Sequence, residues 1–195
     1  MPNTKEEAIW IETFTGKKVN PYRLQLDDID IRDIAHSLSL LCRFVGHCNI
    51  FYSVAQHSLH VSDLVFHELG QQVVEDVRFA SRTCLAALLH DGAEAYISDI
   101  SRPVKYSIRE FGELERRISG KIMQKFGCVG ADWTLIKKMD SKMLASEALY
   151  LMHSKGEGWY LPEPPITCTI SSHTPEAIEH LFLERFHTIR GKQPL

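Results

Sequence analysis

The sequence predicts an all-α fold, and two observations carry that prediction. Apolar residues recur at intervals of three and four over most of the chain from Asp28 onward, which is the period of an amphipathic helix. Glycine and proline divide this pattern into about six or more helical segments. The 195 residues suit one domain, with an N-terminal arm over residues 1–26, a core over about 28–154 and a C-terminal loop and helix over 155–195.

The elements follow from local signals along the chain. The arm has turn signals and a short alternation of apolar residues, which is typical of a strand or hairpin. Ser53 is a candidate N-cap, and Pro103 should stop helix extension, which leaves Lys105 in a loop. The residues after 154 are rich in proline and glycine and read as a loop. The periodic segments predict helices from about 28 to the break at Gly46, and over about 53–67, 72–91, 108–126, 132–154 and 175–190.

Composition excludes several classes of protein. Hydrophobic residues make up 44% and charged residues 24%, which are values of a globular chain. The net charge of −3 and the lack of a basic stripe argue against a nucleic-acid partner, and no apolar run approaches a membrane span. The five cysteines are odd in number and include no CxxC pair, which argues against a disulfide framework or a zinc ribbon. We expect a reduced, cytoplasmic protein.

Three ionisable side chains interrupt the apolar faces of three different predicted helices. His57 lies between Val54 and Val61 on one stripe, Asp91 ends the stripe of the next helix, and Asp140 lies on an apolar face further on. An unpaired carboxylate in a protein core costs several kcal/mol, or becomes neutral. A divalent cation would satisfy all three groups at once.

His90 directly precedes Asp91 and adds a second nitrogen donor. A set of two histidines and two aspartates suits Mn, Fe, Co, Ni or Zn better than Ca, which prefers oxygen alone. Glu94 follows His90 by four residues and Asp91 by three, so on a helix it would share their face. Glu94 is thus placed to reach a water molecule at the metal without being a ligand.

Each of these residues also has a purely structural explanation. A buried histidine is commonly a hydrogen-bonded core residue, and an inward aspartate could pair with Arg43 or Lys105. A His-Asp dipeptide is expected about 0.5 times by chance in a chain of this composition. Spacing alone therefore leaves a metal site and a structural role both open.

The order of His57, then the His90-Asp91 pair, then Asp140 resembles the H…HD…D signature of the HD-domain metal-dependent phosphohydrolases. The surrounding segments VAQHS, LLHDGAEAYISDISRPVK and KKMDSKMLASE are similar to the compact nucleotidase branch of that superfamily. The resemblance covers roughly Asp28 to Glu147, and its first part is most similar to phage and prophage members. It implies a helical bundle of the HD type.

The resemblance also implies a role for individual residues. Glu94 matches the glutamate that positions or activates the attacking water, and Asp99 matches an aspartate that supports proton transfer or substrate binding. Arg43 and Lys105 match basic positions that contact substrate phosphates. Phe44 occupies a position where the deoxynucleotidases commonly have tryptophan, so packing of the nucleoside should differ in detail. The implied metal ligands are His57, His90, Asp91 and Asp140.

The function expected from this resemblance is hydrolysis of a 2′-deoxynucleotide by a divalent transition metal. The first hypothesis is a dATP triphosphohydrolase that releases deoxyadenosine and triphosphate, with a second divalent ion such as Mg on the triphosphate. The alternatives are a 5′-deoxynucleotidase that releases phosphate from dNMPs, and a non-catalytic regulatory protein that retains the HD shell. His47 is a further candidate substrate contact or a cap of helix carbonyls. Related proteins form dimers or hexamers, so we expect a homo-oligomer.

Overall fold

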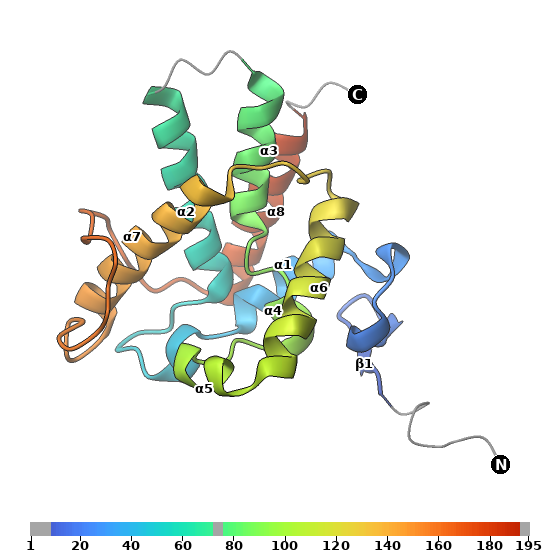
Figure 1. Cartoon of the computed structure of the whole chain (residues 1–195), viewed down its shortest axis with the longest axis horizontal. Coiled ribbons are helices and arrows are strands. Elements are labelled where there is room, and N and C mark those ends of the chain that lie inside the picture. Colours follow the sequence, from blue (N-terminus) through green and yellow to red (C-terminus); the bar gives the residue numbers. More distant parts are fainter. Residues whose placement is uncertain (1–8, 72–75, 192–195) are drawn as a thin grey trace.

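A computed structural model describes residues 9–71 and 76–191, which form eight α-helices and one small hairpin (Figure 1). This confirms the all-α prediction. Among the described residues, no helix is both long and apolar enough to cross a membrane. The helices are α1 (Ile31–Leu40), α2 (Val54–Gln71), α3 (Val77–Leu88), α4 (Glu94–Ile97), α5 (Arg102–Ser107), α6 (Arg109–Lys125), α7 (Trp133–Leu151) and α8 (Pro175–Gly191).

The N-terminal arm contains the hairpin suggested by the sequence. Strand β1 (Ile11–Glu12) pairs antiparallel with β2 (Lys18–Val19) across a turn that includes Gly16 in the left-handed region, at φ 80°. The backbone N–H and the hydroxyl of Thr15 both donate to the buried carboxylate of Asp33 on α1. The arm is thereby attached to the helical body.

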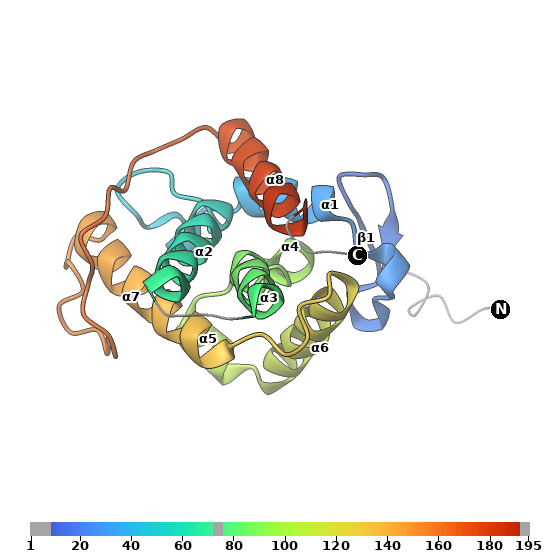
Figure 2. The ribbon, with the colours of Figure 1, turned by 90° about the horizontal axis from the view of Figure 1, so that it is seen from above.

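Helix α3 lies in the middle of the molecule, with α2 and α8 beside it (Figure 2). Its later residues are buried because they face neighbours on several sides, among them α2, α7 and α8. Helix α1 packs on α8 and on α2. The end of α3 and the start of α2 therefore lie inside the bundle rather than at its surface.

Short polar side chains begin the helices at the positions that capping chemistry favours. Ser53 Oγ accepts a hydrogen bond from the backbone N–H of Gln56 at 3.1 Å, which confirms the predicted cap of α2. Asp132 accepts from the N–H of Leu135 and begins α7. The predicted limits of α6, α7 and α8 agree with the structure within one to three residues.

The end of α3 differs from the prediction. The helix stops at Leu88 and a turn follows, so Asp91 lies beyond the helix and not on its inward face. A Cβ on Gly92 would lie 2.9 Å from the carbonyl oxygen of Leu89 and 3.3 Å from Ile122 Cδ1. The turn thus packs too closely against itself and α6 to admit a side chain. The predicted start of this helix at Gln72 lies outside the described residues.

Two other elements also correct the sequence-based expectation. Pro103 lies in the first turn of α5, where its missing N–H is not needed, so Lys105 belongs to a helix and not to a loop. Arg43 lies beyond the end of α1, in the 3-10 segment η3 (Arg43–Gly46). Within η3, Phe44 and Val45 are left-handed, at φ 57° and 55°, a conformation that cannot continue a helix.

Candidate metal centre

In each of two histidine rings, Nδ1 makes a hydrogen bond and Nε2 points toward the same pair of aspartate carboxylates. His57, in the first turns of α2, is completely buried, and its Nδ1 lies 2.6 Å from Glu147 Oε1. His90, in the turn after α3, has Nδ1 2.8 Å from the carbonyl oxygen of Ala87. A carbonyl oxygen only accepts, so His90 Nδ1 carries the proton and its Nε2 presents a lone pair.

The free Nε2 atoms of both histidines face carboxylate oxygens from two other segments. His57 Nε2 lies 3.1 Å from Asp140 Oδ1 on α7 and 3.7 Å from Asp91 Oδ2. His90 Nε2 lies 3.2 Å from Asp91 Oδ2 and 4.0 Å from Asp140 Oδ1. Neither nitrogen has a well-aligned hydrogen-bond partner among the described residues, although both are buried. The two nitrogens therefore lie among carboxylate oxygens without a well-aligned hydrogen bond.

The spacing of these atoms fits a shared metal ion. Ligand atoms about 2.1 Å from one ion lie roughly 3.0–4.2 Å apart, depending on the angle between them. The four distances of 3.1–4.0 Å fall in that range. One donor atom each from His57, His90 and Asp140 lies within 4.8 Å of the others. Asp91 is not part of this group of three, although its Oδ2 lies 3.2 Å from His90 Nε2 and 3.7 Å from His57 Nε2. A mixed nitrogen and oxygen set of this kind suits a divalent transition metal.

Glu147 was not among the sequence-predicted site residues, and it supports two of them. It is completely buried on α7, and while Oε1 contacts His57, Oε2 accepts a hydrogen bond from Arg43 at 3.0 Å. Glu147 follows Asp140 by seven residues, which is two helical turns on the same face. That spacing is the signal that could have identified it. Carboxylates that orient metal-binding histidines in this way are common in metalloproteins.

The electrostatics of the site favour bound positive charge. Burial and then Arg43 lower the pKa of His57, but Glu147 and Asp140 outweigh both and raise it to about 9. Burial raises the pKa of Glu147, yet Arg43 and His57 bring it below its ordinary value, so the carboxylate is ionised. Burial likewise opposes ionisation of Asp91, whose pKa is nonetheless lowered by the neighbouring histidines and Arg43. A proton on His57 therefore balances part of the negative charge of these carboxylates.

Glu94 lies one turn beyond Asp91, at the start of α4, and is buried. Burial, followed by the charges of Asp91 and Asp99, raises the pKa of Glu94 well above its ordinary value. Lys105 on α5 lies 3.8 Å from Glu94 Oε1 and donates a 2.6 Å hydrogen bond to Glu115 on α6. Lys105 is therefore a paired, positioned cation and not the freely moving loop charge that the sequence suggested.

Asp99 is half-buried in the segment between α4 and α5. Burial and Asp91 raise its pKa, whereas Arg43 and Lys105 oppose the rise. The charges that act on Asp99 are thus those of the metal-site residues, which puts it in the same electrostatic environment. Asp99 thus interacts electrostatically with Asp91, Arg43 and Lys105, but no direct contact joins it to His57 or His90 among the described interactions.

Arg43 lies between the candidate metal ligand Asp91 and the aromatic ring of Phe44. Its Nη1 lies 3.6 Å from Asp91 Oδ2, and its guanidinium carbon lies 5.3 Å from the centre of the Phe44 ring. The Phe44 ring lies 6.0 Å from that of Trp159, in the long segment after α7. Trp159 was missed because a tryptophan in an irregular segment carries no periodic signal. His47 is exposed, and no contact in the described structure joins it to the site.

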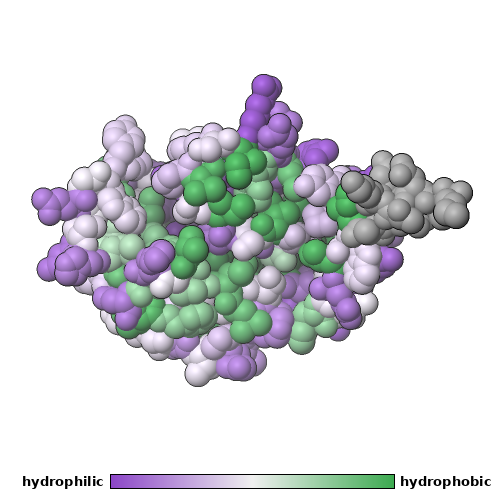
Figure 3. All heavy atoms as spheres, turned by 90° about the horizontal axis from the view of Figure 1, so that it is seen from below, coloured by the Kyte–Doolittle hydropathy of each residue, from purple (hydrophilic) through white to green (hydrophobic). Residues whose placement is uncertain are grey.

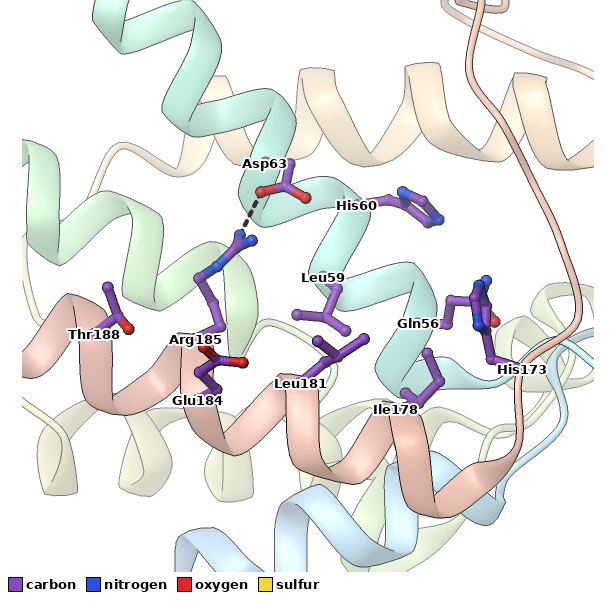
Figure 4. A pocket seen from close by; sticks show the side chains of 10 residues that line it. All are labelled: Gln56, Leu59, His60, Asp63, His173, Ile178, Leu181, Glu184, Arg185 and Thr188. Carbon is purple, nitrogen blue, oxygen red and sulfur yellow. Dashed lines mark hydrogen bonds and ion pairs between the residues drawn. The ribbon is translucent and has the colours of Figure 1, made fainter.

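The surface of the protein carries an apolar region and, apart from it, a hollow. Figure 3 shows apolar side chains gathered on the face where α5 lies, and the exposed apolar residues of this region include Val45, Val104 and Ile108. A hollow of about 310 Å³ lies elsewhere, between α2 and α8, with the Asp63–Arg185 ion pair at one end (Figure 4). Its lining includes Gln56 and His60 but none of the predicted metal ligands, so it is separate from this centre.

Comparison with known proteins identifies similar sequences. No protein-family model matches it. The chain is 36% identical over 183 residues to the uncharacterized protein YfdR of Escherichia coli (strain K12), a match that covers 92% of this chain and 95% of YfdR. It is also 35% identical over 121 residues to an uncharacterized protein of Rhodobacter capsulatus, covering 60% of this chain and 58% of that protein. The near-complete match to YfdR shows that the chain belongs to the YfdR family.

Proposed function

We propose that the protein is a metal-dependent phosphohydrolase of the HD type that acts on 2′-deoxynucleotides. The observation that carries this proposal is the pair of buried Nε2 atoms of His57 and His90. Each ring is fixed through Nδ1, and the free nitrogens converge with Asp91 and Asp140. Two half-buried carboxylates beside two buried nitrogens without a well-aligned hydrogen bond suit a cation better than a structural role.

The residues that would hold the ion are His57, His90, Asp91 and Asp140. A divalent ion bound there supplies charge neutralisation on a phosphoryl oxygen and lowers the pKa of water. Mn, Fe, Co, Ni and Zn all fit the donor set. A second ion such as Mg would accompany a triphosphate rather than the protein, because the donors described above serve a single centre.

Glu94 is the proposed proton acceptor. Burial and the nearby carboxylates raise its pKa, so it takes up a proton more readily than an exposed glutamate does, as a proton acceptor must. Lys105 beside it limits that rise and helps to return the proton. Asp99, whose pKa is also raised by burial, is the proposed donor to the departing 5′ oxygen of the sugar.

Arg43 and the aromatic pair are the proposed contacts to substrate. Arg43 is a positioned cation, because its Nη2 donates to Glu147 and its Nη1 lies 3.6 Å from Asp91, and its remaining N–H groups are the proposed donors to phosphate oxygens. Phe44 and Trp159 present aromatic surface next to it, on which a base can stack. The segment that carries Trp159 is attached to α7 where the N–H of Ile166 donates to Ser146 Oγ at 2.9 Å.

The preferred reaction is hydrolysis of dATP to deoxyadenosine and triphosphate. Water attacks the phosphorus next to the sugar, and the bond from that phosphorus to the 5′ oxygen breaks. The water oxygen remains on the triphosphate, and the 5′ oxygen leaves with a proton. Lys105, on a separate helix from Arg43, extends the positive surface that a triphosphate tail needs.

A 5′-deoxynucleotidase is the second candidate, and one observation favours it. Lys105 is bound to Glu115 at 2.6 Å, and it must leave that partner before it can follow a triphosphate. A monophosphate needs only the metal and Arg43. In this case the same bond, from phosphorus to the 5′ oxygen, is broken in a dNMP and orthophosphate is released.

The deciding experiment is product analysis with the full chain. The protein is incubated with each dNMP, dNDP and dNTP in the presence of Mn, Co, Zn or Mg, and products are separated by ion exchange. We expect deoxyadenosine and intact triphosphate from dATP. Orthophosphate from dAMP with dATP unchanged would instead establish the second candidate. No hydrolysis with any metal would contradict both and favour a non-catalytic role.

A further inference from the structure

Two cysteines face each other on either side of the segment that carries Arg43. The Sγ atoms of Cys42 and Cys48 lie 3.5 Å apart, and the Cys48 thiol also donates to the carbonyl oxygen of Arg43 at 3.7 Å. Both side chains are half-buried, whereas Cys84 and Cys128 are buried in the core. The two thiols of this pair are therefore close enough to react with each other, whereas Cys84 and Cys128 are enclosed in the core.

Backbone hydrogen bonds on both sides of the segment 42–48 fix the positions of the two cysteines. Cys42 forms an antiparallel bridge with Ser53, and the N–H of Arg43 donates to the carbonyl oxygen of Tyr52 at 2.9 Å. On the other side, the N–H of Asn49 donates to the carbonyl oxygen of Leu151 at 3.0 Å. Both ends of the segment are thus attached to the body of the protein.

Between these anchors the chain coils tightly. Phe44, Val45 and Gly46 are consecutive left-handed residues, at φ 57°, 55° and 77°. Glycine adopts this conformation freely, but a β-branched valine does so only under constraint from its surroundings. The coil returns the chain on itself within five residues, and this return is what brings the two sulfurs together.

We propose that Cys42 and Cys48 form a modification site, at which a small-molecule disulfide such as oxidised glutathione converts the two thiols into an intramolecular disulfide. The sulfurs would need to approach by about 1.5 Å to reach the bond length of about 2.05 Å, a movement available to side-chain rotation. The reaction does not depend on the proposed function.

The exchange proceeds in two balanced steps. The thiolate of Cys42 attacks one sulfur of oxidised glutathione, forms a mixed disulfide and releases one glutathione thiolate. Cys48 then loses its proton and attacks the Cys42 sulfur, which releases the second glutathione. Two protons and two electrons leave the protein, and one oxidised glutathione becomes two reduced molecules. Burial and the contact with Cys42 raise the pKa of Cys48 to about 11, so Cys48 is mostly protonated near neutral pH, and its position 3.5 Å from the Cys42 sulfur is what favours the second, intramolecular step.

The new bond would close a short loop around Arg43 and Phe44. Because the loop ends are already attached to Tyr52 and Leu151, the disulfide would fix the Arg43 backbone from both sides. Fewer conformations of this loop remain accessible in the unfolded chain, so oxidation should stabilise the protein. Any effect on nucleotide binding rests on the proposed function, but the bond and the stabilisation do not.

The sequence offers a direct test, because trypsin cleaves after Arg43 and puts the two cysteines on separate peptides, 33–43 and 44–78. The full chain is incubated with oxidised glutathione, free thiols are blocked with N-ethylmaleimide, and the non-reducing digest is analysed by mass spectrometry. We expect peptides 33–43 and 44–78 joined by a disulfide that dithiothreitol removes. Oxidation should also raise Tm by about 5 °C or more.

Two variants separate this pair from other thiol chemistry. Cys168→Ser removes a half-buried cysteine elsewhere and should retain both the joined peptides and the rise in Tm. Cys48→Ser should lose both. Glutathione adducts on the native protein without the joined peptides would overturn the proposal, as would joined peptides that form only after unfolding in urea.

Discussion

Glu147 and His57 share a 2.6 Å hydrogen bond between two side chains that have no exposed surface. The second oxygen of the same carboxylate holds Arg43 at 3.0 Å. One buried acid on α7 therefore orients a predicted metal ligand and the arginine predicted to bind phosphate. The candidate metal ligand and the proposed phosphate contact therefore depend on the same carboxylate.

Replacing Glu147 by glutamine should weaken metal binding by roughly 10- to 100-fold, because His57 loses the charged partner that fixes its ring. Metal titration of the stripped protein measures the change. Glu179→Gln is the matched control, since Glu179 pairs with His36 at 2.9 Å outside the site. Equal metal affinity in Glu147→Gln and the wild type would show that the carboxylate does not support the metal.

Replacing Glu94 by glutamine should separate chemistry from binding. The variant keeps the side-chain shape but cannot accept a proton, so kcat should fall by roughly 10²-fold or more while metal content is unchanged. Glu113→Gln, an exposed change on α6, serves as the control in the same assay. If Glu94→Gln retains nearly full turnover, another group accepts the proton, and Asp99 is then the first residue to test.

Replacing Lys105 by alanine tests the choice between a triphosphate and a monophosphate. We expect KM for dATP to rise about tenfold, which corresponds to the loss of one charged contact, with little effect on any hydrolysis of dAMP. Glu115→Gln removes the negative charge that holds Lys105 at 2.6 Å and should not raise KM for dATP. Equal impairment of dATP and dAMP hydrolysis by Lys105→Ala would argue against a role on the triphosphate tail.

Removal of the metal should destabilise the fold, because Asp91 and Asp140 would then face one another without a cation. Binding to the native state alone contributes roughly 4 kcal/mol at a free metal concentration 1,000-fold above Kd. For a chain of this size that corresponds to a fall in Tm of about 8 °C or more on chelation. Differential scanning calorimetry before and after verified stripping measures it, and an unchanged Tm would contradict buried ligation.

The helical framework could be predicted from the sequence because its signals are local. The cap at Ser53 and the apolar period around His57 depend on neighbours within one or two turns. The end of α3 was not predicted: after Leu88 the chain turns, Gly92 N–H donates to the carbonyl oxygen of Leu89, and Gly92 packs against Ile122 of α6, which is thirty residues away in the sequence. Pro103 was misjudged because proline ends a helix or begins one, according to its position.

A candidate site residue could be predicted only where the local sequence pattern set it apart. His57 and Asp140 stand out as polar groups on apolar stripes, and the structure brings both to the same place as His90. Asp91 reaches this place from a turn, although its predicted helical position was wrong. Glu147 and Trp159 were missed, because a partner of a ligand or a distant aromatic ring is defined by tertiary contact rather than by spacing.

The most direct test of the account is the metal content of the purified protein. Elemental analysis should find about one divalent transition metal per chain in the wild type, and little in His57→Ala, His90→Ala or Asp140→Ala. His36→Ala, which removes a histidine with a different carboxylate partner, should retain the metal. Stoichiometric metal in all three site variants, or none in a wild type purified with Mn, Co and Zn, would contradict the proposed centre.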